Sequence, residues 1–237
     1  MQKNIHKKSR LAIISDTGMC LKGGIYIFEP VFREVKNFSH LFGEIIWMGY
    51  ENKKYKSSDN KLKYNDDDLF IVNYYDESPT LKRLKKYPRL EMPLNLTLIP
   101  VKYSGGSSIF SKILILFYSP YYLINILRII IRSDIVFTRG PSMPALLTIL
   151  LSFLFSNKKY WHKYAGNWQI GSKTLTYRLQ RWLLKKKIPG TVIISGRNKS
   201  DLSHVLSWKN PCLTDQEIGT NTEYGLNKKF DGKLVLC

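Results

Sequence analysis

Four residues in loops after predicted strands have the chemistry to bind a phosphate group. Gly23 and Gly24 follow the first predicted strand, and Arg139 and Arg197 lie in later loops. Glycine lets backbone N–H groups approach a phosphate, and arginine offers a planar fork of donors that matches phosphate or carboxylate. A plain turn would also account for the glycine pair and for either arginine loop. We therefore treat all four as candidates for contact with an anionic ligand.

A fifth candidate, His162, comes from the segment 158–164, which reads KKYWHKY. Alternation along a strand places His162 and Lys163 on opposite faces. His162 could exchange a proton at neutral pH, although a lone histidine in a strand is more often a core residue. Arg139 stays charged at neutral pH and could not serve as a base. His162 and Arg139 are thus only weak catalytic candidates.

The loop that follows this segment, AGNWQIGS, is suited to a carbohydrate. Asn167 and Trp168 fall at the carboxyl end of the predicted strand. Sugars offer apolar faces and rims of hydroxyl groups, which aromatic rings and amides complement. We expect Lys163, Asn167 and Trp168 to contact an acceptor of this kind. The plainer interpretation is that Trp168 caps the sheet.

Strand-like and helix-like segments alternate along the chain, and this order predicts how the loops are positioned. Strands separated by helix-length segments indicate a parallel sheet with crossover helices, whose ligands bind at the carboxyl ends of the strands. The fold class is therefore α/β, with helices on both faces of the sheet. Strands are expected at 10–15, 44–48, 69–73, 95–101, 134–138, 158–164 and 191–195. Helices are expected at 25–41, 109–131, 145–155, 173–187 and 199–206.

The net charge indicates an anionic partner. Lys and Arg number 37 against 18 Asp and Glu, which gives +19 in 237 residues. Nucleic acid, an acidic membrane surface and phosphorylated substrates are the three classes that such a surplus favours. The three cysteines are far apart and form no metal-ligand or disulfide pattern, so no metal site is predicted.

Two features bear on membranes. The stretch 109–131 is long enough to span a bilayer, but Lys112 and Arg128 would each cost roughly 2.5–3.5 kcal/mol near its centre. We favour soluble helices over membrane spans for this stretch and for 145–155, whose 11 residues are short for a span and usual for a buried helix. The basic amphipathic helix at 173–187 fits an anionic membrane surface, although a solvated basic face is the usual meaning of such charge.

The order of the segments resembles the N-terminal half of GT-B-fold glycosyltransferases of the retaining family 4 type. The resemblance rests on Lys22-Gly23-Gly24 after the first strand, GEIIWMG, DIVFTRGPS, KYWHKYAGNW and VIISGRNKSDL. It covers nearly the whole chain, and the KYAGNW segment is also similar to transferases of capsule and O-antigen assembly. In this family the glycine loop faces the cleft between two domains. Many members carry a histidine where this chain has Arg139.

This resemblance implies a Rossmann-like domain over residues 1–230, and residues 231–237 (DGKLVLC) look like the first strand of a second domain that is absent. It implies transfer of a sugar from a nucleotide-sugar donor to a lipid-linked or polysaccharide acceptor, without a metal or other cofactor. Gly23, Gly24, Arg139 and Arg197 would then face the donor phosphates.

It also leads us to expect a cytoplasmic protein, peripheral at the inner face of the membrane. We expect little or no transferase activity from the chain alone, and a further chain could supply the second domain. Nucleic acid is not an expected partner of such an enzyme.

Two other classes of function remain open. A nucleic-acid-binding protein would explain the charge, although no RRM, KH or zinc-finger signature is present. A membrane-anchored, non-enzymatic protein would use 109–131 as its span.

Overall fold

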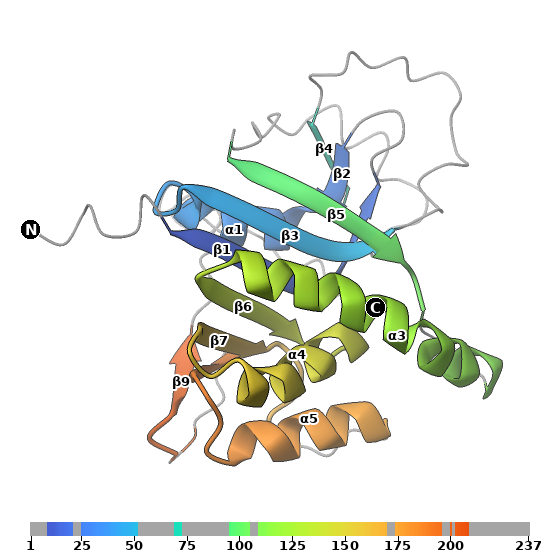
Figure 1. The fold of residues 1–237 in the computed structure, drawn as a ribbon, viewed down its shortest axis with the longest axis vertical. Coiled ribbons are helices and arrows are strands. Elements are labelled where there is room, and N and C mark those ends of the chain that lie inside the picture. Colours follow the sequence, from blue (N-terminus) through green and yellow to red (C-terminus); the bar gives the residue numbers. More distant parts are fainter. Residues whose placement is uncertain are drawn as a thin grey trace, which may run out of the picture.

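A central sheet organises the structure, a computed structural model that describes residues 9–20, 25–51, 69–72, 95–104, 109–169, 174–195, 200 and 202–208 (Figure 1). Within these residues the sheet has nine strands. They are β1 Arg10–Cys20, β2 Ile25–Phe28, β3 Glu44–Glu51, β4 Leu69–Val72, β5 Leu96–Lys102, β6 Ile135–Gly140, β7 Lys159–Tyr164, β8 Thr191–Ser195 and β9 Val205–Trp208. The helices are α1 Glu29–Ser39, α3 Ile109–Arg132, α4 Met143–Leu154 and α5 Leu175–Lys185.

Seven of the strands form one all-parallel path in the order β5-β3-β1-β6-β7-β8-β9. The chain builds outward from β1 to β5, then returns to β6 and builds outward on the other side. The order therefore reverses between β1 and β6, as in doubly wound α/β folds, which bind ligands at the carboxyl ends of the strands at this point. The predicted α/β fold class, with a Rossmann-like sheet, is confirmed.

Helices cover both faces of the sheet, as the alternation of segments predicts. Leu11, Ile13 and Trp47 pack with Val31 and Phe32 of α1 on one face. Their neighbours along the strands point to the opposite face, which α3 and α4 cover together. Figure 1 shows α3, α4 and α5 on the side of the sheet nearer the viewer and α1 behind it.

Two predicted helices are wrong in part. Residues 25–28 begin the expected helix at 25–41 but form β2, which pairs antiparallel with β1 and parallel with β4. Residues 205–208 form β9 beside β8, where a helix at 199–206 is expected. Both segments are rich in β-branched and aromatic residues, and an available strand edge favours the extended form over helical periodicity.

The first strand is longer than expected because it contains a bulge. β1 runs to Cys20, but its pairing with β3 jumps from Ile14 to Gly18 while β3 advances only from Met48 to Tyr50. Three residues of β1 therefore lie opposite Gly49. A Cβ atom on Gly49 would lie 2.5 Å from the carbonyl oxygen of Thr17, so glycine is what lets the two strands approach. Bulges re-aim side chains, and this one lies at the carboxyl end of the sheet.

Candidate functional site

Three polar side chains from neighbouring strands lie in one row at the carboxyl ends of β1, β6 and β7. The register pairs Ser15 with Arg139 and Arg139 with Lys163. All three belong to the face that α1 covers, because they alternate in phase with the core residues below them. The strand order reverses between the first two of these strands. The row therefore stands at the expected ligand-binding edge.

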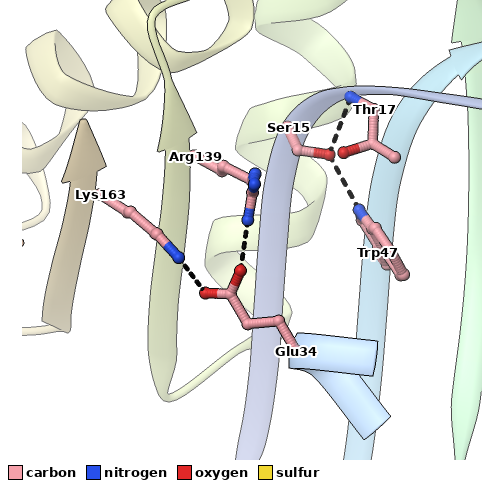
Figure 2. A network of polar contacts seen from close by, with 6 residues as sticks. All are labelled: Ser15, Thr17, Glu34, Trp47, Arg139 and Lys163. Atoms are coloured by element: carbon pink, nitrogen blue, oxygen red, sulfur yellow. Dashed lines mark hydrogen bonds and ion pairs between the residues drawn. The ribbon is translucent and has the colours of Figure 1, made fainter. Parts of the chain in front are cut away.

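A carboxylate from α1 joins the two basic residues of this row. Glu34 accepts hydrogen bonds from Arg139 Nη1 and from Lys163 Nζ, the second at 2.5 Å, and Figure 2 shows its carboxylate between them. The side chains of Glu34 and Lys163 are only 6% and 2% exposed. Burying a charge is costly unless a partner compensates it, so the three groups must be accommodated as a unit. Two cations against one carboxylate leave the unit positive.

The Ser15 hydroxyl fixes the bulge next to this unit. It accepts hydrogen bonds from the indole Nε1 of Trp47 at 2.9 Å and from the backbone N–H of Thr17 at 3.2 Å (Figure 2). It donates to the carbonyl of Met48 at 3.4 Å. The one donor and both acceptor positions of this buried hydroxyl are therefore occupied. Its role is to hold the backbone that carries the next residue.

The next residue, Asp16, is titratable, and its side chain is exposed to solvent at this site. Its side chain keeps contact with solvent although protein crowds around it. This desolvation raises the pKa of the Asp16 carboxyl, and the charge of Arg139 works in the opposite direction. A carboxylate with a raised pKa at a ligand-binding edge is suited to hydrogen bonds with hydroxyl groups of a ligand.

Two tyrosines, Tyr50 on β3 and Tyr177 on α5, interact electrostatically with Asp16. Burial raises the pKa of both Tyr50 and Tyr177, and the negative charge of Asp16 adds to the shift in each. The hydroxyl of Tyr122 lies near Tyr50 and donates to the carbonyl of Lys102 at 2.6 Å. These phenols stay protonated at neutral pH and can donate hydrogen bonds. The Asp16 cluster, defined as Asp16, Tyr50, Arg139 and Tyr177, therefore combines an acid, two hydroxyls and a guanidinium.

The structure separates the two weak catalytic candidates. Arg139 belongs to the α1 face, whereas His162 is fully buried on the opposite face and stacks on Tyr160. His162 Nε2 lies 3.1 Å from the carbonyl of Pro189, to which it must donate, and Nδ1 has no hydrogen-bond partner. Burial lowers the pKa of His162 to about 4, which the Pro189 hydrogen bond only partly offsets. This histidine is a neutral core residue away from the Asp16 cluster.

The three residues expected to contact an acceptor have different environments. Lys163 is buried and paired with Glu34. Trp168 is buried against Tyr164 in the core below α5, as the capping interpretation holds. Asn167 is exposed in the loop, where its Oδ1 accepts from the N–H of Gln169 at 3.0 Å. Of the three, only Asn167 presents its side chain to solvent.

Three of the predicted phosphate-binding residues, Gly23, Gly24 and Arg197, lie outside the described residues. Within the described part of the chain, no group of three or more His, Cys, Asp or Glu side chains could hold a metal ion.

Neither Glu34 nor Asp16 was predicted as a site residue. Glu34 falls three residues after Val31 and four before Phe38, so its place on the apolar side of α1 was a signal for a buried charge. Asp16 directly follows the apolar run of the first strand, which places it at the ligand-binding edge of a parallel sheet. No sequence pattern linked Tyr50 or Tyr177 to Asp16, because these residues are far apart along the chain and interact only in the folded structure.

Comparison with known proteins adds no identification: no protein-family model matches the chain, and no curated protein is similar to it.

Proposed function

We propose that this chain is the acceptor-side domain of a glycosyltransferase. It would take part in moving a sugar from a nucleotide-sugar donor to a lipid-linked or polysaccharide acceptor in cell-surface glycan assembly. One observation carries the proposal, which is the gathering of the Asp16 cluster where the strand order reverses. An acid, phenol hydroxyls and a fixed positive charge suit a ligand that has both hydroxyls and a diphosphate.

Each member of the cluster has a role in this proposal. The Asp16 carboxylate accepts hydrogen bonds from sugar hydroxyls, and the hydroxyl of Tyr177 supplies a donor beside it. Tyr50 is buried, with its hydroxyl hydrogen-bonded to Ser104, and lowers the polarity around Asp16 without reaching the ligand.

Glu34 holds Arg139 and Lys163 in place by ion pairs. The net positive charge of these three groups would then lie near the leaving diphosphate. Such preorganised charge stabilises a transition state because little reorganisation is needed during the reaction.

The resemblance in strand order and loop position supports the same proposal and assigns most donor contacts to a second domain. We therefore expect the 237-residue chain alone to bind ligands but to transfer little sugar. Binding is for this reason the sharper test. Clear sugar transfer by the purified chain would contradict the expected division of labour between two domains.

The test is ligand-detected NMR with a panel of nucleotide sugars, glycans and single-stranded RNA. We expect a nucleotide sugar or a glycan to bind, and Asp16→Asn to weaken that binding by roughly tenfold, the effect of one lost charged hydrogen bond. The matched control is Asp134→Asn at the opposite edge of the sheet, where the Asp134 carboxylate accepts from the backbone N–H of Arg10 at 2.8 Å. This control should leave the affinity unchanged.

The same titration has a pH signature. Because the pKa of Asp16 is raised, its carboxylate is lost at a higher pH than that of an ordinary aspartate. Affinity should thus fall as the pH is lowered, and Asp16→Asn should remove this dependence. Binding that is equal in both proteins, or binding of RNA alone, would overturn the proposal.

A further inference from the structure

Helix α5 turns its apolar stripe away from the protein core. Gln180 and Leu184 form its buried side, whereas Leu175, Leu179 and Trp182 are exposed, the first by 76% and the last by 56%. These three residues lie on successive turns of one helix face. Surface helices normally bury an apolar stripe against the core. An apolar stripe that faces outward therefore indicates a binding surface for another molecule or a membrane.

The exposed stripe lines a groove between α3, α4 and α5 with a volume of about 900 Å³. The groove wall combines large apolar side chains with basic ones, and none of its lining residues is acidic. The basic members are Lys112, Arg178, Arg181 and Lys185. The three helices together contain no aspartate or glutamate at all. The groove is therefore both apolar and positively charged.

Helix α3 continues the same surface with its N-terminal half. Leu116 and Phe117 are 73% and 76% exposed, while Tyr122 and Ile126 in the second half are buried against the sheet. The stretch Lys112–Arg132 is the one candidate membrane span in the described part of the chain by length and composition. The part of this stretch before Tyr122, residues 112–121, would extend only about 15 Å along a helix axis, against roughly 30 Å for a bilayer core.

We propose that this groove and the exposed half of α3 dock onto the headgroup and acyl boundary of an anionic phospholipid bilayer. The basic side chains meet lipid phosphates, while Leu116, Phe117, Leu175 and Trp182 enter the upper acyl region. This is the pattern of an interfacial contact, in which apolar burial and electrostatic attraction act together. The inference goes beyond the proposed function, because it holds whatever the Asp16 cluster binds.

Charge and side-chain type favour a bilayer over other occupants. A second copy of this chain would bring one acid-free basic groove against another, which is repulsive. Nucleic-acid surfaces place aromatic rings for base stacking, whereas half of the large exposed apolar residues on this surface are aliphatic, namely Ile113, Leu116, Leu175 and Leu179. A lipid surface accepts aliphatic tips and lysine or arginine on the same face.

Vesicle flotation with the whole chain tests the proposal. We expect binding to vesicles that contain phosphatidylglycerol, weak binding to pure phosphatidylcholine, and release at high salt. The double variant Lys112→Glu/Arg178→Glu should lower the partition coefficient at least about tenfold. The matched control, Lys36→Glu/Lys159→Glu, makes the same change in charge on α1 and at the start of β7, and should bind nearly as well as the unmodified chain.

Penetration is tested separately with lipids brominated in the upper acyl chain. We expect these lipids to quench tryptophan emission and Trp182→Phe to remove most of the quenching, because Trp182 is on the docking surface. Circular dichroism should show that all variants are folded.

Several results would overturn the docking proposal. They are failure to bind anionic vesicles, equal loss in both charge variants, resistance to extraction by carbonate, and displacement from vesicles by single-stranded RNA. None of them bears on ligand binding at Asp16, so the two proposals fail independently.

Discussion

Gln180 of α5 is bonded twice to the backbone of Ser142 in the turn after β6. Its Oε1 accepts from the Ser142 N–H at 3.2 Å, and its Nε2 donates to the Ser142 carbonyl at 2.6 Å. The amide is fully buried. Gly140 provides the room, since a Cβ there would lie 2.8 Å from Gln180 Oε1. A single side chain thus fastens α5 to the turn that directly follows the strand end carrying Arg139.

We expect Gln180→Leu to lower the free energy of unfolding by about 1–3 kcal/mol, because the buried Ser142 N–H loses its partner. The Ser142 carbonyl keeps one bond, from the N–H of Leu146 at 3.0 Å. Urea denaturation followed by tryptophan fluorescence measures the change. Gln169→Leu, at an exposed position in the preceding loop, is the matched control and should cost little. Equal stability of the two variants would mean that these hydrogen bonds do not hold α5.

The ion pairs of Glu34 give a second prediction. Glu34→Gln leaves the cations of Arg139 and Lys163 without their carboxylate in a buried place, and the free energy of unfolding should fall by about 3–5 kcal/mol. The double variant Glu34→Gln/Lys163→Met should recover part of this loss, since one of the two stranded charges is gone. Glu44→Gln at the start of β3 serves as the control in the same urea titration. Additive losses in the double variant would contradict the coupling.

His162 predicts an acid-sensitive step in stability. The pKa of this buried imidazole is lowered from 6.5 to about 4, so the unfolded chain takes up a proton at a higher pH than the folded chain. Stability is unaffected above pH 6.5 and falls as the pH drops from 6.5 towards 4, by roughly 3 kcal/mol in all. Carboxylates titrate in the same window, so the informative quantity is the difference between variants.

His162→Gln should flatten this dependence, because glutamine does not titrate and its amide can still donate to Pro189. His40→Gln, at an exposed position, should retain it. The free energy of unfolding at neutral pH and at pH about 5 distinguishes the two variants. A histidine that titrates normally would show the same slope in both.

Local pattern predicted much of this fold, and tertiary context decided the rest. The strand at 191–195 lies where expected, because a short apolar run before a turn has few alternatives. Residues 25–28 were misassigned because helical spacing in the following residues extends into them, while their partner is the far end of β1. Pairing across the chain is not visible in a local window of sequence.

The site was predictable in part for the same reason. Arg139 could be placed at the ligand-binding edge because it follows a buried strand. Its partner Glu34 is 105 residues away, and the ion pair exists only because α1 packs over β6. Lys163 was expected to contact an acceptor, whereas the structure pairs it with that same carboxylate.

Because of the bulge in β1, residues near Asp16 tolerate changes in sequence that the core part of the same strand does not. Residues 11–14 are paired on both sides, so the insertion of one residue there would turn the following side chains to the wrong face. Asp16 and Thr17 have no partner in the registers with β3 and β6. Changes of residue type, or even of length, at these two positions leave the core register intact. If Asp16 contacts a ligand as we propose, its side chain can therefore change without rebuilding the fold.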